Sequence, residues 1–377
     1  MRPGHVGLNL VYLVPGETGG METYARELIP ALRAARPGLR ITAFVNREAA
    51  AAGGGPWGEE VPAVTVPVRA GRRSEWVRGE QLLLPGLATR AGVDLLHSPG
   101  NTAPLRGRFR RVVTVHDLIH RIHPEAHFGL NATAMRWLVA LAVRRTDRVI
   151  VPSAATRADL LAILGTPATK IDVVPQGVVA PPKLPPTAVA DCRRRFDLGE
   201  RAVVLAAAAK RPHKNLPRLL RALALIPAEH RPLLVIPGYP TPHEAELQRQ
   251  ATALGLDDDL RMPGWVPGPE LEGLYASAAV FAFPSLYEGF GLPLLEAMAR
   301  GVPVACSDRG ALAEVAGDAA LRFDPERPEQ IAAAIEALLS DPATADRLRG
   351  AGRRRAAGFT WDATAKATLA SYERAAA

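Results

Sequence analysis

Cysteine is scarce in this 377-residue sequence, which contains only Cys192 and Cys306, far apart in the chain. Neither cysteine belongs to a group with metal-ligand spacing, so the sequence predicts no cysteine-based zinc site. A chain of this size without a disulfide framework is typical of a reducing compartment. We therefore expect a cytoplasmic location and assign no function to either cysteine.

Long hydrophobic runs and nucleic-acid signatures are also missing. No apolar run approaches the roughly 18 residues that a membrane-spanning helix needs. The stretch Val6–Val14 is interrupted by Gly7 and Asn9 and has no small-residue cleavage site after it, so a first strand is expected there and not a signal peptide. The net charge of +8 suits phosphate-rich ligands, anionic lipid head groups or nucleic acid. Nucleic acid is not expected, because zinc-finger, helix-turn-helix and RNA-binding motifs are absent.

Short apolar runs alternate with helical patterns along most of the chain, which is typical of β-α-β units and parallel sheets. The strands expected in the first half are Val6–Val14, Ile41–Val45, Val64–Val68, Leu95–His97, Val112–His116, Val149–Val151 and Ile171–Val174. The helices expected there include Glu22–Arg36, Trp76–Ala91, Leu130–Arg145 and Ala154–Leu164. The strands expected in the second half are Ala202–Ala209, Leu233–Ile236, Leu260–Met262, Ala279–Phe283, Val302–Cys306 and Ala320–Phe323.

The predicted architecture is an α/β fold with two doubly wound, Rossmann-like parallel-sheet domains. The first domain is expected over residues 1–180, a proline-rich hinge over 181–197, and the second domain over 198–358. The segment Val179–Pro186 reads V-A-P-P-K-L-P-P, which suits a stiff linker. Residues 359–377 have apolar positions at helical spacing and should form a helix that packs back towards the first domain. Because ligands bind beyond the carboxyl ends of such strands, a site between the domains is expected.

The most informative stretch is Pro284–Gly301, which reads P-S-L-Y-E-G-F-G-L-P-L-L-E-A-M-A-R-G. It follows an apolar strand, passes through a glycine turn and enters a helix, for which Pro293 suits the first position. Free backbone N–H groups and a positive dipole end make such a helix start a site for phosphate. Glu288 and Glu296 flank this site, so a ligand with both phosphates and hydroxyls, such as a nucleotide sugar, is indicated.

Two glycines and a His-Asp pair mark further candidate positions in the first half. Gly19 and Gly20 open the first helix and could admit a phosphate, with a structural tight turn as an equal alternative. Neither a dehydrogenase fingerprint nor a P-loop is present. His116 and Asp117 end a strand, where a histidine could bond a sugar hydroxyl. Taken in isolation, this pair is better explained as a capping or core pair.

Basic segments supply the remaining candidates. Lys210–Asn215 reads K-R-P-H-K-N between a strand and a helix, where cations would stabilise a departing diphosphate. Arg69–Arg78 could meet an anionic membrane or acceptor, although composition alone favours a solvated loop. His120, His123 and His127 lack a matching carboxylate or cysteine pattern, so no metal is expected.

Together these motifs resemble the retaining glycosyltransferases of family 4, which have the two-Rossmann GT-B fold with a central cleft. The core of the resemblance is the E-x7-E motif from Glu288 to Glu296. The other segments that carry it, spread over nearly the whole chain, are Gly19–Tyr24, His116–Asp117, Gln176–Val178, His213–Leu216, Pro303–Ala305, Ser307–Asp308, Glu314–Ala320, Phe323–Pro325 and Phe359–Trp361.

The resemblance implies transfer of a hexose from a nucleotide diphosphate sugar with retention of configuration, without metal or cofactor. Glu288 would contact the donor sugar, Lys214 the diphosphate, and Glu296 the ribose. The catalytic residues implied are His116, Glu288 and Lys214; the donor-binding residues are Gly19, Gly20, Lys210, Arg211, Val266, Gly289, Phe290, Gly291, Leu292 and Glu296; Asp117 would lie on the acceptor side. Many relatives carry Gly-Arg before the lysine; here either Lys210 or Arg211 replaces that arginine, and Lys210 is preferred.

The donor and the acceptor are less specified by the sequence. The local sequences around Val115–Leu118 and Ala209–Asn215 most resemble those of mannosyl- or rhamnosyltransferases. GDP-mannose is therefore the leading donor, and UDP- and dTDP-sugars stay open. A glycan or lipid-linked acceptor, a cell-envelope polysaccharide precursor, and a peripheral contact with an anionic membrane are expected. The oligomeric state is left open. The alternatives are a GT-B sugar-nucleotide 2-epimerase and a non-catalytic sugar-nucleotide-binding protein.

Overall fold

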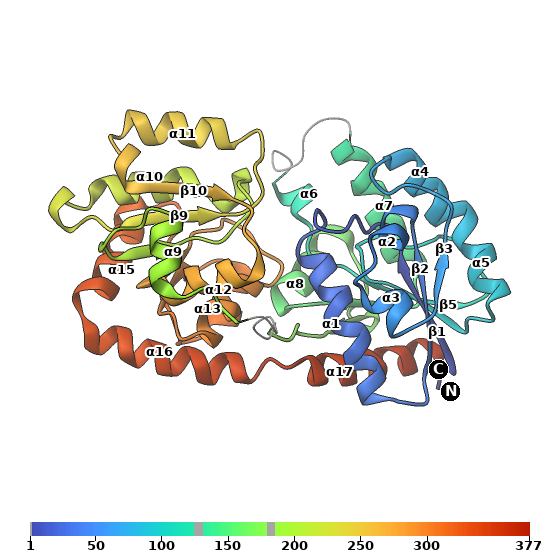
Figure 1. Ribbon diagram of the computed structural model, residues 1–377. Coiled ribbons are helices and arrows are strands. Elements are labelled where there is room, and N and C mark those ends of the chain that lie inside the picture. Colours follow the sequence, from blue (N-terminus) through green and yellow to red (C-terminus); the bar gives the residue numbers. More distant parts are fainter. Residues whose placement is uncertain (1, 124–130, 179–184) are drawn as a thin grey trace. The chain divides into compact units, whose positions relative to one another are not determined.

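The computed structural model describes residues 2–123, 131–178 and 185–377, with the side chains of 131–134 excepted (Figure 1). The chain forms two compact units. Unit 1 comprises Met1–Gly177 together with Phe359–Ala377, and unit 2 comprises Val178–Gly358. Most of the predicted linker Val179–Pro186 lies outside the described residues, as does His127. Each unit is described by itself below, and the predicted site between the domains stays a prediction.

Unit 1 is built on a seven-stranded parallel sheet with the strand order β3-β2-β1-β4-β5-β6-β7. All six residues of β1 are buried, because helices cover both faces of a parallel sheet. The strands are β1 (His5–Leu10), β2 (Arg40–Val45), β3 (Ala63–Thr65), β4 (Leu95–Ser98), β5 (Arg110–Thr114), β6 (Arg148–Val151) and β7 (Ile171–Val173). The helices are α1 (Gly20–Ala35), α2 (Arg47–Ala52), α3 (Pro56–Glu59), α4 (Arg73–Arg78), the π-helical η1 (Gly79–Leu83), α5 (Leu84–Arg90), α6 (Ile119–Ile122), α7 (Asn131–Arg145), α8 (Ala154–Leu164), the 3₁₀ helix η3 (Ala168–Lys170) and α17 (Trp361–Ala376).

Unit 2 is built on a six-stranded parallel sheet with the order β10-β9-β8-β11-β12-β13. Its strands are β8 (Val203–Leu205), β9 (Leu233–Pro237), β10 (Leu260–Gly264), β11 (Val280–Phe283), β12 (Val304–Ser307) and β13 (Leu321–Phe323). Its helices are α9 (Val189–Arg195), η4 (Pro212–Lys214), α10 (Leu216–Leu225), η5 (Ala228–His230), α11 (Glu244–Ala253), η6 (Asp257–Asp259), α12 (Gly268–Ser277), α13 (Leu292–Ala299), α14 (Gly310–Ala316), α15 (Pro328–Ser340) and α16 (Pro342–Ala357). The predicted fold class, with two Rossmann-like parallel sheets, is confirmed.

Several segments differ from the sequence-based predictions, including the strand predicted over Ala202–Ala209, of which only Val203–Leu205 forms β8. The first strand ends at Leu10 and not at Val14, because the Asn46 side chain donates to the carbonyls of Val11 and Leu13 and turns the chain. The helix predicted over Trp76–Ala91 is a succession of α4, η1 and α5. The π-helical η1 comes directly before α5. Pro85 lies in the first turn of α5 and has no backbone N–H, so one regular helical hydrogen bond is missing there.

The proline-rich hinge predicted over 181–197 is too long, since Val189–Arg195 forms α9. This helix packs against α12 within unit 2. Cys192 of α9 is fully buried, and a Cβ atom at Gly273 of α12 would lie 3.2 Å from its Sγ. Close packing of this kind makes α9 an ordered part of unit 2.

The final helix α17 belongs to unit 1, where it packs against α1, β5 and β6. Its buried residues Ala365, Leu369, Tyr372 and Ala375 join the same apolar core as β1 and α1. The buried carboxylate of Asp172 in β7 accepts a hydrogen bond from Ser371, and Arg374 forms an ion pair with it at 3.0 Å. Both apolar burial and polar contacts therefore hold α17 in unit 1.

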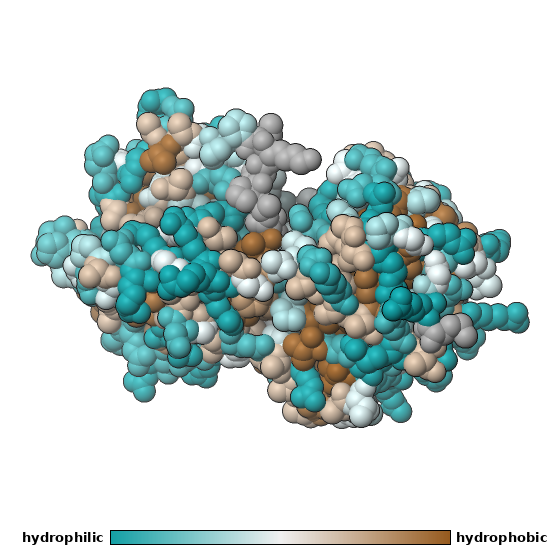
Figure 2. Space-filling model, turned by 90° about the horizontal axis from the view of Figure 1, so that it is seen from below, coloured by the Kyte–Doolittle hydropathy of each residue, from teal (hydrophilic) through white to brown (hydrophobic). Residues whose placement is uncertain are grey.

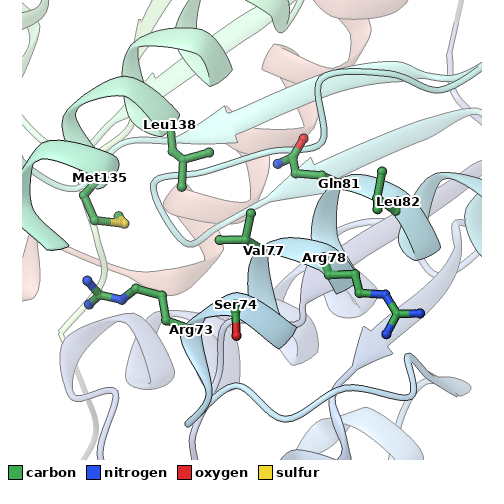
Figure 3. Close-up of a pocket in the computed structure, with 8 residues that line it drawn as sticks. All are labelled: Arg73, Ser74, Val77, Arg78, Gln81, Leu82, Met135 and Leu138. Carbon is green, nitrogen blue, oxygen red and sulfur yellow. The ribbon is translucent and has the colours of Figure 1, made fainter. Parts of the chain in front are cut away.

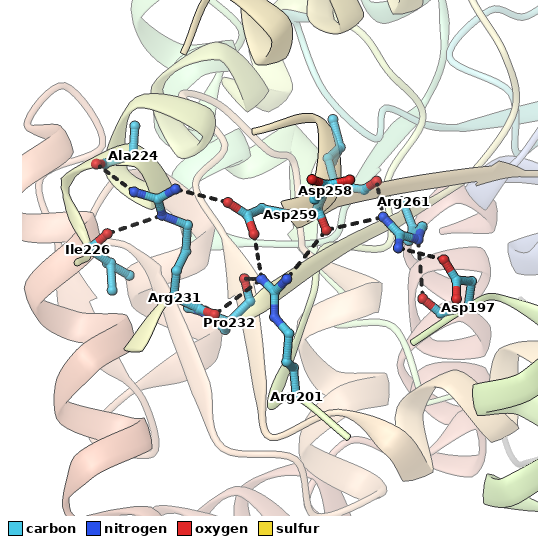
Figure 4. A network of polar contacts seen from close by, with 10 residues as sticks. Asp197, Arg201, Ala224, Ile226, Arg231, Pro232, Asp258, Asp259 and Arg261 are labelled. Atoms are coloured by element: carbon cyan, nitrogen blue, oxygen red, sulfur yellow. Dashed lines mark hydrogen bonds and ion pairs between the residues drawn. The ribbon is translucent and has the colours of Figure 1, made fainter. Parts of the chain in front are cut away.

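Three arginines of unit 2 form ion pairs at the amino-terminal edge of its sheet (Figure 4). Arg201 and Arg231 both pair with Asp259, at 2.6 and 2.9 Å, and Arg261 pairs with Asp197 at 2.7 Å. These arginines lie where β8, β9 and β10 begin, whereas ligands of parallel sheets bind at the opposite edge. These three arginines are therefore paired with carboxylates at the edge away from a ligand and leave the net charge of +8 unchanged.

The face drawn in Figure 2 is hydrophilic over most of its area, with small hydrophobic patches. Among the described residues, none of the helices combines the length and apolar character that crossing a bilayer requires.

Candidate active site

The glycine turn and the helix start predicted around Glu288 are present at the carboxyl end of β11. The turn leads into α13, which begins at Leu292, one residue before the predicted start. Gly291 is the residue before the helix and has φ 108°, a backbone conformation that favours glycine. A Cβ atom at Gly291 would also lie 2.6 Å from a methyl carbon of Leu312. Glycine is therefore required at this position, and the helix N-terminus stays uncovered by a side chain.

Glu288 and Lys214 meet in this turn. Lys214 Nζ donates to Glu288 Oε1 at 2.5 Å, and both side chains are mostly buried, with 16% and 14% exposed. The Lys214 ammonium also lies 5.4 Å from the ring centroid of Phe283, the last residue of β11. The two implied catalytic residues of unit 2 are thus brought together as a charge-compensated pair.

Asn215 holds the two turns of this site in register. Its backbone is left-handed, with φ 58°, which asparagine tolerates better than most residues. Its Nδ2 donates to the carbonyls of Pro284 and Pro325, at 3.0 and 2.7 Å. A further backbone bond joins Leu286 to the carbonyl of His213 at 2.8 Å. Asn215 was not among the predicted site residues, although its place after Lys214 was the available signal.

The second glutamate, Glu296, lies on the first full turn of α13 in a different environment. The Tyr275 hydroxyl donates to Glu296 Oε2 at 3.2 Å. Burial raises the pKa of the Glu296 carboxyl, and the nearby Arg300 and the Tyr275 hydroxyl oppose that rise. Arg300 itself pairs with Glu272 and lies over the Tyr275 ring at 4.9 Å. Glu296 therefore has a carboxyl group that is held in place by a buried phenol.

Lys210 and Arg211, the two candidates for the diphosphate, are placed differently. The Lys210 side chain is inaccessible to solvent, and its Nζ donates to the carbonyl of Gly238 at 3.1 Å. Its Nζ also forms an ion pair with Glu244 at 3.3 Å. Arg211 is exposed. The preference for Lys210 at a diphosphate does not fit this burial, because its ammonium is committed to protein groups.

The other predicted donor residues of unit 2 surround the glycine turn or follow β10. Gly289 is partly buried, whereas Phe290, Leu292 and Val266 are each at most 9% exposed. Val266 lies two residues after β10, beside the exposed Trp265.

In unit 1, His116 follows β5 and has both ring nitrogens bound to protein groups. Nε2 lies 2.8 Å from the carbonyl of Pro99, which can only accept, so Nε2 carries the proton. Nδ1 then accepts from the side-chain amide of Gln176 at 3.1 Å. Burial lowers the pKa of His116 to about 4. The imidazole is therefore neutral at pH 7, and its tautomer is determined by these two partners.

The neighbouring predicted residues of unit 1 have simpler roles in the fold. Asp117 accepts the backbone N–H of Ile119 at 3.0 Å, at the start of α6. Gly19 precedes α1 with φ 62°, and open space surrounds the Cβ position of both Gly19 and Gly20. Glu22 accepts from the backbone N–H of Gly16 and pairs with an arginine one turn on, which fixes the loop before α1.

The predicted basic segment Arg69–Arg78 lies beside an apolar pocket of about 530 Å³ in unit 1. Figure 3 shows Val77 of α4 opposite Leu138 of α7. Met135 completes the apolar wall on the α7 side, and Arg73 and Arg78 lie at its rim. Among the described residues, no group of three or more histidine, cysteine, aspartate or glutamate side chains could hold a metal ion.

Known structures share the fold of the whole chain. Sucrose-phosphate synthase from Thermosynechococcus elongatus aligns with a TM-score of 0.77 at 23% identity, covering 98% of each chain. Anabaena Alr3699/HepE, solved in complex with UDP and glucose, aligns with a TM-score of 0.75 at 21% identity, covering 97% of this chain and 98% of that one. The two Rossmann-like units, with a glycine turn and acid pair in one of them, define a GT-B protein.

Sequence comparisons narrow this class to a family. Residues 18–180 match the family described as Glycosyltransferase Family 4, and residues 193–355 match Glycosyl transferases group 1. O-antigen chain mannosyltransferase B of Escherichia coli is 31% identical over 74% of each chain. A D-inositol 3-phosphate glycosyltransferase of Kineococcus radiotolerans is 30% identical over 96% of this chain and 91% of that protein. The chain belongs to the glycosyltransferases of family 4, so the predicted family and enzyme class are confirmed.

Proposed function

We propose that the protein is a retaining hexosyltransferase that uses a nucleotide diphosphate sugar, with GDP-mannose as the leading donor. The acceptor would be a hydroxyl group of a glycan or a lipid-linked glycan, in the synthesis of a cell-envelope polysaccharide. The observation that carries the proposal is the pair of Lys214 and Glu288 at the start of α13. The names of two relatives, the E. coli mannosyltransferase and a Mycolicibacterium hassiacum MMP alpha-(1->4)-mannosyltransferase that is 32% identical, support mannose.

In this proposal the charge pair exchanges partners when the donor binds. The diphosphate would replace Glu288 as the partner of Lys214, and the carboxylate of Glu288 would turn to the hydroxyls of the transferred sugar. The N-terminus of α13 would add backbone N–H groups, whose approach requires the missing side chain of Gly291. Because the lysine and glutamate neutralise each other before binding, neither charge is left uncompensated in a mostly buried turn.

The transfer step breaks the bond between the anomeric carbon and the diphosphate oxygen and forms a bond from that carbon to the acceptor oxygen. Both events would take place on one face of the sugar, and the acceptor proton would pass to the departing phosphate oxygen. Lys214 and the helix dipole stabilise the charge that develops on the leaving group. We do not assign Glu288 as a covalent nucleophile, since a carboxylate that holds sugar hydroxyls is poorly aimed at the anomeric carbon. No metal or cofactor is proposed.

A ligand panel tests the donor assignment. GDP, UDP, dTDP and ADP are each added to the protein in a thermal-shift assay, with and without EDTA. GDP is expected to raise the melting temperature most, and EDTA should leave the shift unchanged. If none of the four nucleotides stabilises the fold, the donor site is not where we place it. Turnover with GDP-mannose then separates the enzyme from a binding protein, and a changed sugar without any acceptor would indicate an epimerase.

Variants of the charge pair test the catalytic assignment. Glu288→Ala and Lys214→Ala should each lower turnover by a factor on the order of 100 or more, because they remove groups aimed at developing charge. Both variants should keep the circular dichroism spectrum of the parent. The matched control is Lys366→Met, at an exposed lysine of α17. Near-normal turnover of both site variants would refute the site.

The acceptor assay includes a second candidate because of one comparison. The D-inositol 3-phosphate glycosyltransferase of Kineococcus radiotolerans matches 96% of this chain, whereas the two mannosyltransferases match 74% and 71%. An inositol phosphate is therefore tested beside glycan acceptors, with UDP-sugars beside GDP-mannose. Product with the inositol phosphate alone would reassign the substrates without changing the enzyme class.

We also propose that the rim of the apolar pocket meets an anionic membrane surface. Arg73 and Arg78 would contact lipid phosphates, while Leu82, which is 71% exposed, would enter the interface. Sedimentation with phosphatidylglycerol vesicles should pull down the protein, and phosphatidylcholine vesicles should not. Arg73→Glu should abolish this binding, and Arg354→Glu in unit 2 serves as the charge-matched control. Equal binding of both variants would exclude this surface.

A further inference from the structure

The buried Lys210 binds one loop of unit 2 through both its side chain and its backbone. Its Nζ donates to the carbonyl of Gly238 at 3.1 Å and forms an ion pair with Glu244 at 3.3 Å. The Thr241 hydroxyl donates to the carbonyl of Lys210. These three contacts reach the loop 238–243 between β9 and α11, and Glu244, the first residue of α11. The Lys210 side chain, which is inaccessible to solvent, thus holds this loop in place.

Backbone contacts bring the same loop against its neighbours. Gly238 has φ 145°, and a Cβ atom there would lie 2.3 Å from the carbonyl oxygen of Ala208. The Gly238 N–H donates to the carbonyl of Gly264, the last residue of β10, at 2.8 Å. Only glycine allows this close approach of three backbone segments. The start of the loop therefore lies against the end of β10 and the segment that follows β8.

Two exposed aromatic side chains lie directly at this junction. Tyr239 follows Gly238, and Trp265 follows Gly264; their ring centroids are 6.2 Å apart with an interplanar angle of 25°. Tyr239 is 36% exposed and Trp265 is 56% exposed. Both lie at the carboxyl edge of the sheet, where parallel sheets bind ligands. Exposed aromatic faces of this kind offer stacking to a flat ring.

We propose that Tyr239 and Trp265 form a stacking platform for the base of the nucleotide donor, and that Lys210 is the positioning residue that holds this platform. The inference rests on the proposed use of a nucleotide sugar. It gives Lys210 a different task from the diphosphate contact that the sequence suggested. The diphosphate contact falls instead to Lys214 and the exposed Arg211.

The electrostatics of Lys210 agree with a structural anchor. Burial lowers the pKa of its ammonium group, and the carboxylate of Glu244 opposes that change. The ammonium faces Glu244 and the carbonyl of Gly238, so its charge is satisfied within the loop it holds. A ligand phosphate would have to displace both partners to reach it.

The experiment compares GDP with inorganic pyrophosphate, which lacks the base. Binding of GDP is measured by calorimetry and by tryptophan fluorescence, and binding of pyrophosphate by its competition with GDP. Trp265→Ala and Tyr239→Ala should each weaken GDP at least fivefold, since loss of one base–aromatic stack costs roughly 5- to 150-fold in affinity. Neither change should alter the affinity for pyrophosphate. Trp137→Ala, at a tryptophan of unit 1 that is 67% exposed, is the matched control.

Lys210→Met separates a positioning role from direct contact. It should weaken the binding of GDP as the aromatic variants do and leave the affinity for pyrophosphate unchanged. It should also raise the KM for the donor while kcat stays near the parent value. Equal weakening of GDP and pyrophosphate would make Lys210 a diphosphate ligand and overturn the inference. Unchanged GDP binding in the aromatic variants would also overturn it.

Two further outcomes have their own interpretation. If Lys210→Met does not fold, Thr241→Val removes one contact of the same anchor, and it should weaken GDP without changing pyrophosphate; unaltered GDP binding would then count against the anchor. If the unaltered protein binds no nucleoside diphosphate, the proposed function and this ligand class fail together. That failure appears before any variant is made, so the two failures are distinguishable.

Discussion

Replacing Tyr372 by phenylalanine removes one hydroxyl group from α17 and leaves the aromatic ring in place. The hydroxyl lies 2.8 Å from Nδ1 of His97 in β4, and Tyr372 and His97 are both fully buried. The other ring nitrogen of His97 lies 2.7 Å from the Thr114 hydroxyl. Burial lowers the pKa of His97 to about 3, so the imidazole is neutral at pH 7 and needs one donor and one acceptor as partners.

The magnitude follows from the group that is left behind. Water has no access to His97 Nδ1, so the substitution leaves a buried polar atom without a partner. Such an atom costs about 1–3 kcal/mol, more than the net value of an ordinary hydrogen bond. A cavity contribution is not expected, because the phenyl ring fills the same space. The free energy of unfolding should therefore fall by about 1–3 kcal/mol.

Urea unfolding measured by circular dichroism at pH 7 is the assay. Tyr372→Phe should lower the urea midpoint without changing the slope of the transition. Lys366→Met on the same helix is the control, since its ion pair with Asp362 is exposed and should matter little. A Tyr372→Phe midpoint equal to that of the control would refute the reasoning that this buried bond anchors α17.

Three further predictions follow from the site geometry. Gly291→Ala should destabilise the protein by about 1–3 kcal/mol through its positive φ and a contact at 2.6 Å, whereas Gly38→Ala, with open space at Cβ, should not; urea midpoints of the two variants decide this. The pKa of His116 in the folded protein is about 4, below the usual 6.5, so neutral His116 contributes about 3 kcal/mol to the free energy of unfolding above pH 6.5. This contribution is lost as the pH falls to 4. His116→Gln should therefore flatten the pH dependence of the free energy of unfolding, and an unchanged slope would contradict this prediction. Tyr275→Phe should raise the pKa of Glu296 further, so on lowering the pH the affinity for GDP should fall earlier than in the parent. Overlapping pH profiles would exclude this coupling.

The sheets could be predicted because their signal is local. Each strand of both sheets overlaps an apolar run, since a parallel strand buried on both faces needs continuous apolar residues. The glycine turn before α13 could also be predicted, because Gly291 and the acids around it lie within one short stretch. The ends of the strands were harder to predict from the sequence. Asn46, which is distant in sequence, turns the chain after the first strand, and no local pattern around Leu10 indicates that contact.

The surroundings of several residues could not be predicted, because they depend on contacts between distant segments. Lys210 reads as an exposed cation at the mouth of a strand, and only its contact with Gly238 explains its burial. Asn215 reaches Pro325, which is 110 residues away in sequence. The protonation of His116 depends on Gln176 and on one carbonyl group. The motifs therefore supplied candidate residues, while long-range contacts determine which of their charges remain available.

The order of the two units along the chain has a consequence for synthesis. Unit 2 is one continuous segment, Val178–Gly358, inserted into unit 1 before its last helix. Domains fold as units while the chain emerges from the ribosome. Unit 2 can therefore complete its core before unit 1 does, although most of unit 1 precedes it in the chain. Unit 1 is complete only when α17 joins the apolar core that contains Tyr24 and Leu28 of α1. A nascent chain that stops at Gly358 would carry a finished unit 2 and a unit 1 with an exposed apolar surface, which is the kind of surface that chaperones bind.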